Sequence, residues 1–117
     1  MNDIVIWHNP RCSKSRQTLA LLTERGLEVR ERRYLTDTPD AGDIRAALKA
    51  LDLPAIAMMR PKEKLFRELG LSKDDPDEAL IAAMAAHPVL IERPIVFTAG
   101  KARIGRPPEN VLALFQA

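Results

Sequence analysis

The sequence predicts an α/β fold in which one mixed sheet is assembled from a βαβ half and a ββα half. Short runs rich in β-branched residues occur near both ends of the chain. In the first third, the apolar spacing switches between period two and helical spacing, whereas the middle third shows helical spacing only. With 117 residues and 46% hydrophobic content, the chain fits a single domain, residues 1–117, with a core of its own.

The N-terminal half has the pattern strand, helix, strand. The run DIVIW, residues 3–7, is β-rich and predicts a buried strand. Helical spacing then holds from about Ser13 to Arg25, and Gly26 follows as the expected helix stop. Residues 27–35 alternate again and predict a second strand. Because a strand–helix–strand unit joins parallel strands, these two strands should pair in parallel.

The middle of the chain, about residues 38–87, predicts short helices separated by prolines and a glycine. Thr38 or Asp40 can cap the first of these helices, and Pro39 suits a first turn. The clearest helix lies in the segment DDPDEALIAAMAAH, where an acidic first turn precedes an apolar run. We interpret this segment as a helical insertion between the two halves of the sheet.

The C-terminal half predicts a hairpin followed by a helix. Residues 94–98 form a β-branched run, Gly100 provides the turn, and the segment KARIG offers a partner strand. Pro107 and Pro108 suit the start of a last helix. A βαβ half, about residues 1–35, and a ββα half, about residues 88–117, around one mixed sheet form the thioredoxin-like arrangement.

The composition argues against several classes of protein. Lys and Arg number 18 against 16 Asp and Glu, and only 4% of the residues are aromatic, so no nucleic-acid-binding surface is expected. No apolar run approaches the ~20 residues of a membrane span, and no signal peptide is recognisable. One cysteine cannot form an internal disulfide, which favours the cytoplasm. Two histidines and one cysteine are too few for a metal site, and no bound cofactor is expected.

The single cysteine is the first candidate for chemistry. Cys12 lies in the polar loop HNPRCSKS, between the first predicted strand and the first predicted helix. A lone cysteine is often a small buried hydrophobe. Here the helix start and the neighbouring cations should lower the pKa of the thiol, and the loop's backbone N–H groups offer an oxyanion site. In α/β sheets, ligands bind at the carboxyl ends of strands, which favours a functional thiol.

The kind of thiol chemistry is constrained by what surrounds Cys12. A C-x-x-C motif is absent, because Ser13, Lys14 and Ser15 follow. A thiol that resolves an oxidised or adducted Cys12 must therefore come from another molecule. Glutathione together with a glutaredoxin is the obvious cytosolic source. A hydrolase would need only attack and water, whereas a reductase would need this external thiol.

Three segments, HNPRCSKSRQTL, MMRPKEKLFRELGL and HPVLIERPIVFTAGKARIGRPPENVL, together resemble the glutaredoxin-dependent arsenate reductase family, the ArsC family. The resemblance covers essentially the whole chain and is closest to the family's short chromosomal members of the YfgD type. It implies a thioredoxin-like sheet with a helical insertion. It also implies arsenate or a similar oxyanion as substrate, glutathione as co-substrate and glutaredoxin as partner protein.

The resemblance also implies roles for particular residues. Cys12 matches the family's nucleophile, which attacks arsenate to give a thiol–arsenic adduct. Three residues match the arginines that hold the oxyanion: Arg60, Arg93 and Arg106. His8 and Ser15 match residues that help to keep the thiol ionised, and Pro94 falls where thioredoxin-like folds place a cis-proline. Guanidinium forks suit such a substrate because they stay charged and bind oxygens bidentately.

Two other functions stay open. The superfamily also contains redox-sensing regulators that bind RNA polymerase, so the chain could be a partner-binding protein. Those regulators carry a C-x-x-C switch, and Ser15 occupies its second position here. The chain could also be a glutathione-dependent thiol oxidoreductase acting on another substrate. Such an enzyme would need Cys12 and a glutathione groove, but not three arginines converging on one anion.

Overall fold

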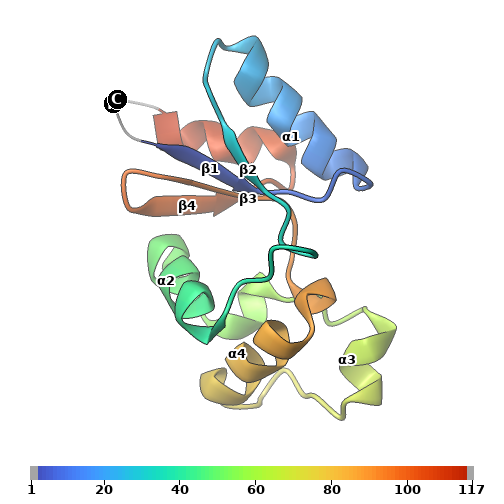
Figure 1. The fold of residues 1–117 in the computed structure, drawn as a ribbon. Helices are drawn as coiled ribbons and strands as arrows, with labels where there is room; N and C mark the ends of the chain where they lie inside the picture. The colour runs from blue at the N-terminus through green and yellow to red at the C-terminus, as the bar shows by residue number, and fades with distance from the viewer. Residues whose placement is uncertain (1–2, 116–117) are drawn as a thin grey trace. The chain divides into compact units, whose positions relative to one another are not determined.

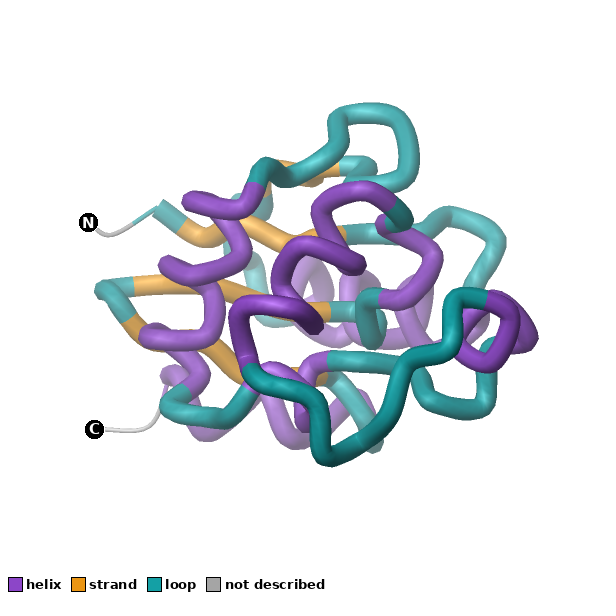
Figure 2. Tube along the Cα trace, turned by 90° about the horizontal axis from the view of Figure 1, so that it is seen from below, coloured by secondary structure: helices purple, strands orange, loops and turns teal. Residues whose placement is uncertain are grey.

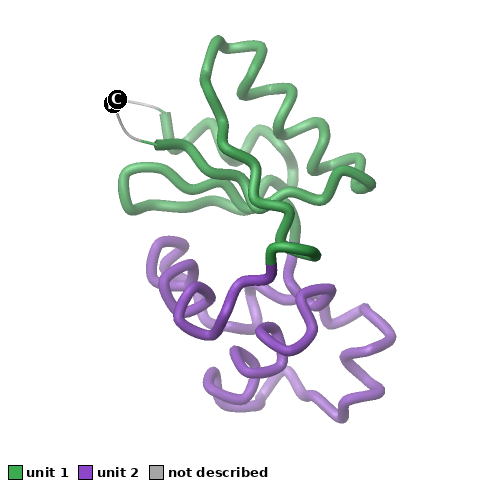
Figure 3. Tube along the Cα trace, viewed as in Figure 1, with its two compact units in different colours: residues 1–37, 93–117 green, residues 38–92 purple. Residues whose placement is uncertain are grey.

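The computed structural model describes residues 3–115 of the chain. It divides the chain into two compact units (Figure 3). The first unit consists of residues 1–37 and 93–117, and the second of residues 38–92. Each unit has its own secondary structure, which is described separately below.

The first unit is built on a four-stranded mixed sheet (Figure 1). Its strands are β1 (Ile4–Trp7), β2 (Arg30–Arg32), β3 (Ile95–Thr98) and β4 (Lys101–Ile104). The strand order is β2-β1-β3-β4, with β1 parallel to β2 and antiparallel to β3, and β4 antiparallel to β3. The predicted α/β class, with one mixed sheet formed by a βαβ and a ββα half, is confirmed.

Two helical elements of the first unit pack against each other, α1 (Ser13–Glu24) and the 3-10 helix η3 (Pro108–Phe115). The apolar residues of this layer form a fully buried cluster: Ile6, Leu22, Val96 and Val111. This cluster ties α1 and η3 to the two central strands. It thereby fixes the start of α1 beyond the end of β1, where the cysteine lies.

Two predicted elements differ from the structure. The second strand was expected over residues 27–35, but β2 is only three residues long, from Arg30 to Arg32. The apolar alternation that suggested a longer strand has another cause, because Leu27 and Val29 pack against the buried cluster from the loop before β2. The last helix is a 3-10 helix, and it begins with a hydrogen bond from the N–H of Asn110 to the carbonyl of Pro107.

The regular elements of the second unit are all helices, apart from an isolated β-bridge between Met59 and Ile91. Figure 2 shows the helices of the whole chain in purple. The helices of the second unit are α2 (Ala41–Leu51), η1 (Ala55–Met58), α3 (Lys64–Glu68), α4 (Asp77–Ala86) and η2 (Pro88–Leu90). Asp40 caps α2 through a capping box, accepting the N–H of Asp43 at 2.7 Å and donating its own N–H back to the Asp43 carboxylate. α4 lies at the centre of the unit and packs against α2, η1 and η2. Between residues 3 and 115, no helix is both long and apolar enough to cross a membrane.

Candidate active site

Cys12 occupies the N-cap position of α1, at the end of the loop that follows β1. Asn9 shapes this loop: its carbonyl accepts the N–H of Cys12, and its side-chain Oδ1 accepts the N–H of Arg11, each at 3.0 Å. The carbonyl of Cys12 accepts the N–H of Arg16 and so begins the helical hydrogen bonding. Cys12 is only 8% exposed. The thiol is therefore held at the helix N-terminus, where unpaired backbone N–H groups converge.

The surroundings of Cys12 favour its ionised form. Burial raises the pKa of the thiol, since a charged sulfur loses hydration. Three groups outweigh this effect. The backbone N–H groups of Ser15 and Lys14 hydrogen bond to the sulfur. The guanidinium of Arg93 also hydrogen bonds to the sulfur, and its positive charge stabilises the thiolate. The net result is a pKa below the ordinary value for cysteine. A thiolate is the nucleophilic form of cysteine, so this thiol is prepared for attack.

Arg93 and Arg106 both lie in the first unit and reach the same place. Arg93 lies two residues before β3 and Arg106 two residues after β4, and the hairpin between them brings the two residues side by side. Arg106 donates from Nε to the carbonyl of Arg93 at 2.8 Å, and its Nη2 lies 3.7 Å from the Cys12 sulfur. The peptide bonds Arg93–Pro94 and Arg106–Pro107 are both cis. The structure thus brings together three predicted site residues: Cys12, Arg93 and Arg106.

The backbone next to Arg106 is packed tightly against its neighbours. The N–H of Gly105 donates to the carbonyl of Pro94 at 2.9 Å. A Cβ atom at Gly105 would lie 2.6 Å from Oγ1 of Thr18 and 2.9 Å from Cγ of Pro94, both closer than van der Waals contact permits. Because glycine has no Cβ, the end of β4 can approach α1 closely. This approach sets the position from which Arg106 extends.

His8 and Ser15 contact each other beneath the thiol loop. Nδ1 of His8 lies 2.6 Å from Oγ of Ser15, and this oxygen also accepts the N–H of Asn9 at 3.0 Å. His8 is 4% exposed, and Ser15 is fully buried. Burial is the main cause that lowers the pKa of His8, so its imidazole is neutral at pH 7. Ser15 therefore faces Cys12 with its backbone N–H and His8 with its hydroxyl.

Glu31 is a neighbour of the site that sequence reasoning did not identify. Its Oε1 lies 4.0 Å from Nε2 of His8, on the side of the imidazole opposite Ser15. β2 places it there, because Glu31 pairs with Ile6 in the parallel register, two residues before His8 on β1. Glu31 and His8 lie 23 positions apart in the sequence, so only the strand register reveals that they are neighbours.

Arg60 belongs to the second unit. Its guanidinium pairs with two carboxylates of that unit, through Nη1 to Glu63 at 2.9 Å and through Nε to Glu92 at 3.7 Å. Its backbone N–H donates to the carbonyl of Leu90 at 2.8 Å. The convergence of Arg60 with Arg93 and Arg106 on one anion stays a prediction.

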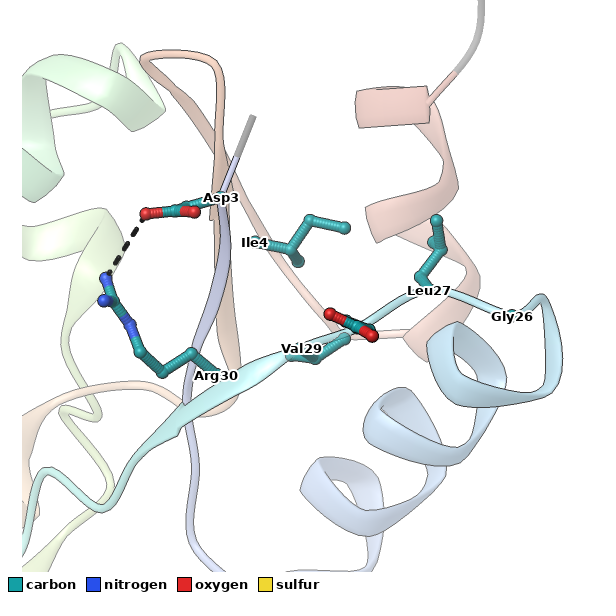
Figure 4. Close-up of a pocket in the computed structure, with 7 residues that line it drawn as sticks. Asp3, Ile4, Gly26, Leu27, Val29 and Arg30 are labelled. Carbon is teal, nitrogen blue, oxygen red and sulfur yellow. Dashed lines mark ion pairs between the residues drawn. The ribbon is translucent and has the colours of Figure 1, made fainter. Parts of the chain in front are cut away.

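A hollow in the first unit lies away from the thiol. It encloses about 660 Å³ and is lined by Asp3, Ile4, Gly26, Leu27, Glu28, Val29 and Arg30 (Figure 4). These residues surround the start of β1, whereas Cys12 follows the end of that strand. The lining contains one ion pair, with 4.0 Å between Arg30 and Asp3, and no nucleophile.

Among the described residues, no group of three or more His, Cys, Asp or Glu side chains could hold a metal ion.

Known proteins are similar to this chain over nearly its whole length. The model of the ArsC family matches residues 7–114. An arsenate reductase of Neisseria meningitidis serogroup A is 48% identical over 116 residues, which cover 97% of this chain and 99% of the relative. The uncharacterized protein YfgD of Escherichia coli K12 is 52% identical over 96% of each chain. A solved structure, an arsenate reductase from Vibrio cholerae, matches with a TM-score of 0.92 and 50% identity over 95% of this chain and 96% of its own.

Proposed function

This chain belongs to the ArsC family, and we propose that it is an arsenate reductase that converts arsenate to arsenite with Cys12 as its nucleophile. The observation that carries the proposal is the group of Cys12, Arg93 and Arg106: a thiol with a lowered pKa beside two guanidinium groups at a helix N-terminus. The names of relatives that are 48% and 42% identical to the chain add support, because both are arsenate reductases.

In the first step, arsenate binds beside the thiol. Arsenate carries more than one negative charge at neutral pH, so its approach to a thiolate needs cations. Arg93 and Arg106 supply guanidinium groups that stay charged, and we assign Arg60 as the third ligand. The backbone N–H groups at the start of α1 add dipoles that favour an anion. Together these groups reduce the repulsion between the two anions and hold the arsenic near the sulfur.

In the second step, the Cys12 thiolate attacks the arsenic atom. An S–As bond forms, and one arsenate oxygen takes up protons and leaves as water. The arsenic remains As(V), so no electrons have yet been transferred. His8 and Ser15 support the thiolate by fixing the loop from which it attacks; their contact at 2.6 Å is buried beneath that loop.

Reduction requires two further thiols, and the chain has no second cysteine to supply one. We assign these thiols to glutathione and a glutaredoxin. Glutathione displaces a second oxygen as water and forms a second As–S bond. A glutaredoxin thiolate then attacks the glutathione sulfur, the electron pair of that As–S bond stays on arsenic, and a mixed disulfide leaves. Hydrolysis of the remaining bond releases arsenite and restores Cys12. This thiol supply fits a reducing compartment such as the cytoplasm.

The test is arsenate-dependent NADPH oxidation, coupled through glutathione, glutathione reductase and glutaredoxin. The wild type should be active, and Cys12→Ser should be inactive, because a serine hydroxyl is not ionised at this pH. Ser13→Ala is the matched control, since it changes an exposed residue beside Cys12 and keeps the thiol. Leaving out glutaredoxin or replacing it with thioredoxin tests the assigned thiol partner separately.

A wild type without activity, despite a Cys12 that alkylates as a thiolate at neutral pH, would exclude arsenate as the substrate. The same protein would then be assayed with glutathione mixed disulfides and for binding to protein partners. A thiol oxidoreductase should lose activity in Cys12→Ser but keep it when Arg106 is replaced by lysine, since its substrate is not an oxyanion.

A further inference from the structure

Ser15 stands at a branch point between two possible hydrogen-bond partners. Its hydroxyl already accepts the N–H of Asn9 at 3.0 Å, and it lies 2.6 Å from Nδ1 of His8. A hydroxyl has one proton to donate and two lone pairs that accept. The direction of the bond between Ser15 and His8 therefore decides where the only hydroxyl proton of Ser15 points.

The tautomer of His8 sets that direction. When the imidazole proton is on Nε2, Nδ1 is an acceptor and Ser15 donates to it. When the proton is on Nδ1, it is donated to Ser15, and both lone pairs of the hydroxyl are then occupied. In that arrangement the Ser15 proton needs a different acceptor. We take the Cys12 sulfur as that acceptor, since it is an anion to which the backbone N–H of the same residue hydrogen bonds.

Two anions therefore flank the hydrogen bond between Ser15 and His8. The Cys12 thiolate receives the backbone N–H of Ser15, and the carboxylate of Glu31 has its Oε1 4.0 Å from Nε2 of His8, an electrostatic contact longer than a hydrogen bond. We propose that Glu31 is a positioning residue: its carboxylate holds the His8 proton on Nε2, so that Ser15 gives its hydroxyl proton to His8 and not to the Cys12 sulfur.

The other charged groups around His8 act in the opposite sense to Glu31. Burial lowers the pKa of His8 most, Glu31 raises it, and Arg33 and Arg16 lower it. Arg33 also competes for Glu31, with its Nη2 3.9 Å from the same carboxylate oxygen. The balance between Glu31 and Arg33 therefore determines how strongly the carboxylate acts on the imidazole.

This arrangement has a chemical consequence for the thiol. With Glu31 in place, the thiolate depends on Arg93 and on backbone N–H groups, which leaves the sulfur more basic and more nucleophilic than an additional hydroxyl donor would. This consequence rests on the proposed role of Cys12 as nucleophile. The arrangement itself can be measured without arsenate, so its failure can be told apart from a failure of the proposed function.

The first measurement is the tautomer of His8 by ¹⁵N NMR, with His87, the other histidine of the chain, as the internal reference. The wild type should carry its proton on Nε2. Glu31→Ala, which changes a residue that is 39% exposed, should shift population towards the Nδ1–H form and lower the pKa of His8. Arg33→Ala is the matched control and should raise that pKa. The same tautomer population in Glu31→Ala and wild type would overturn the proposal.

The second measurement is the rate of Cys12 alkylation by iodoacetamide, at a pH below the pKa of the thiol. A hydrogen bond from Ser15 worth about 0.5–1.5 kcal/mol raises the thiolate fraction roughly two- to tenfold, and the lower nucleophilicity of the less basic sulfur offsets about half of this gain on a logarithmic scale. Glu31→Ala should therefore raise the alkylation rate roughly 1.5- to fourfold. In a Ser15→Ala background, Glu31→Ala should leave the alkylation rate of Cys12 unchanged. An equal increase in both backgrounds would show that Glu31 acts only through its charge, and would also overturn the proposal.

Discussion

Arg106 donates a hydrogen bond from Nε to the backbone carbonyl of Arg93, with 2.8 Å between the two atoms. The bond joins the segment before β3 to the segment after β4. It fixes the plane of the guanidinium, so that Nη2 lies 3.7 Å from the Cys12 sulfur. A rigid fork of N–H donors can serve a carbonyl and an anion at the same time, which an ammonium group on a flexible stem does less well.

Arg106→Lys should therefore keep the charge and lose the geometry. We expect kcat/KM for arsenate to fall about ten- to a hundredfold, the equivalent of one or two hydrogen bonds to a charged group. Steady-state kinetics in the coupled assay would measure the loss. Arg25→Lys is the matched control, because Arg25 is exposed at the opposite end of α1. Equal kinetics in Arg106→Lys and Arg25→Lys would contradict the assignment of Arg106.

Arg93→Met should raise the pKa of Cys12. The guanidinium lowers this pKa both as a hydrogen-bond donor and as a positive charge, and methionine removes both effects while retaining much of the volume. The pH profile of iodoacetamide alkylation would show the midpoint moving upwards, with slower alkylation at neutral pH. Arg103→Met, on an exposed residue of β4, provides the comparison and should leave the midpoint in place. A profile unchanged by Arg93→Met would remove Arg93 from the account of the thiolate.

Ionisation of Cys12 should also contribute to stability. The pKa of the thiol is lower in the folded chain than in the unfolded chain, where it takes its ordinary value of about 8.5. Between the two pKa values the unfolded chain binds more protons, so the free energy of unfolding rises with pH in that window. The contribution is fully present above the unfolded value and is lost as the pH falls through the folded value.

Cys12→Ser removes this dependence on pH. Serine is also a preferred N-cap residue, so the variant should be more stable than the wild type at low pH. The difference should narrow as the pH rises through the window and the wild-type thiol ionises. Urea unfolding at a series of pH values, with a reducing agent present, measures both free energies. A difference that stays constant from acidic pH to pH 9 or so would mean that folding does not shift the thiol's pKa.

The fold was predictable where local signals were strong. The start of α1 at Ser13 followed from the loop with Pro10 and from the apolar spacing that begins after it, and the hairpin followed from two β-rich runs around Gly100. The second strand was predicted too long because alternation marks apolar contact and not strand pairing. Leu27 contributes to the core from a loop, so the alternating apolar pattern in which it takes part did not indicate the length of the strand.

The site was predictable to the extent that it depends on residues adjacent in sequence. The position of Cys12 at a helix start followed from its own segment, and the resemblance to the family indicated Arg93 and Arg106. Glu31 could not be found this way, because only the pairing of β1 with β2 places it beside His8. Strand register is a long-range property, and a slip of one residue would turn the same side chain to the other face of the sheet.

Arg60 should bind arsenate in competition with carboxylates of its own unit. Its guanidinium pairs with Glu63 at 2.9 Å and with Glu92 at 3.7 Å, so an incoming anion has to share or displace these contacts. Arg60→Ala should weaken arsenate binding about tenfold or more, as expected when a charged hydrogen-bond donor is lost. Glu63→Gln should strengthen binding a few-fold, because it removes one competing charge.

Calorimetry with arsenate, in a Cys12→Ser background that cannot turn the substrate over, measures each dissociation constant. Arg67→Ala is the control, because Arg67 is exposed on α3, close to Glu63 in the sequence. The decisive comparison uses the double variant Arg60→Ala, Glu63→Gln. If Glu63 acts by competing for Arg60, Glu63→Gln should leave the dissociation constant for arsenate unchanged in the Arg60→Ala background. Equal strengthening with and without Arg60 would mean that Glu63 repels arsenate directly, and an unaltered affinity in Arg60→Ala would exclude Arg60 as a ligand.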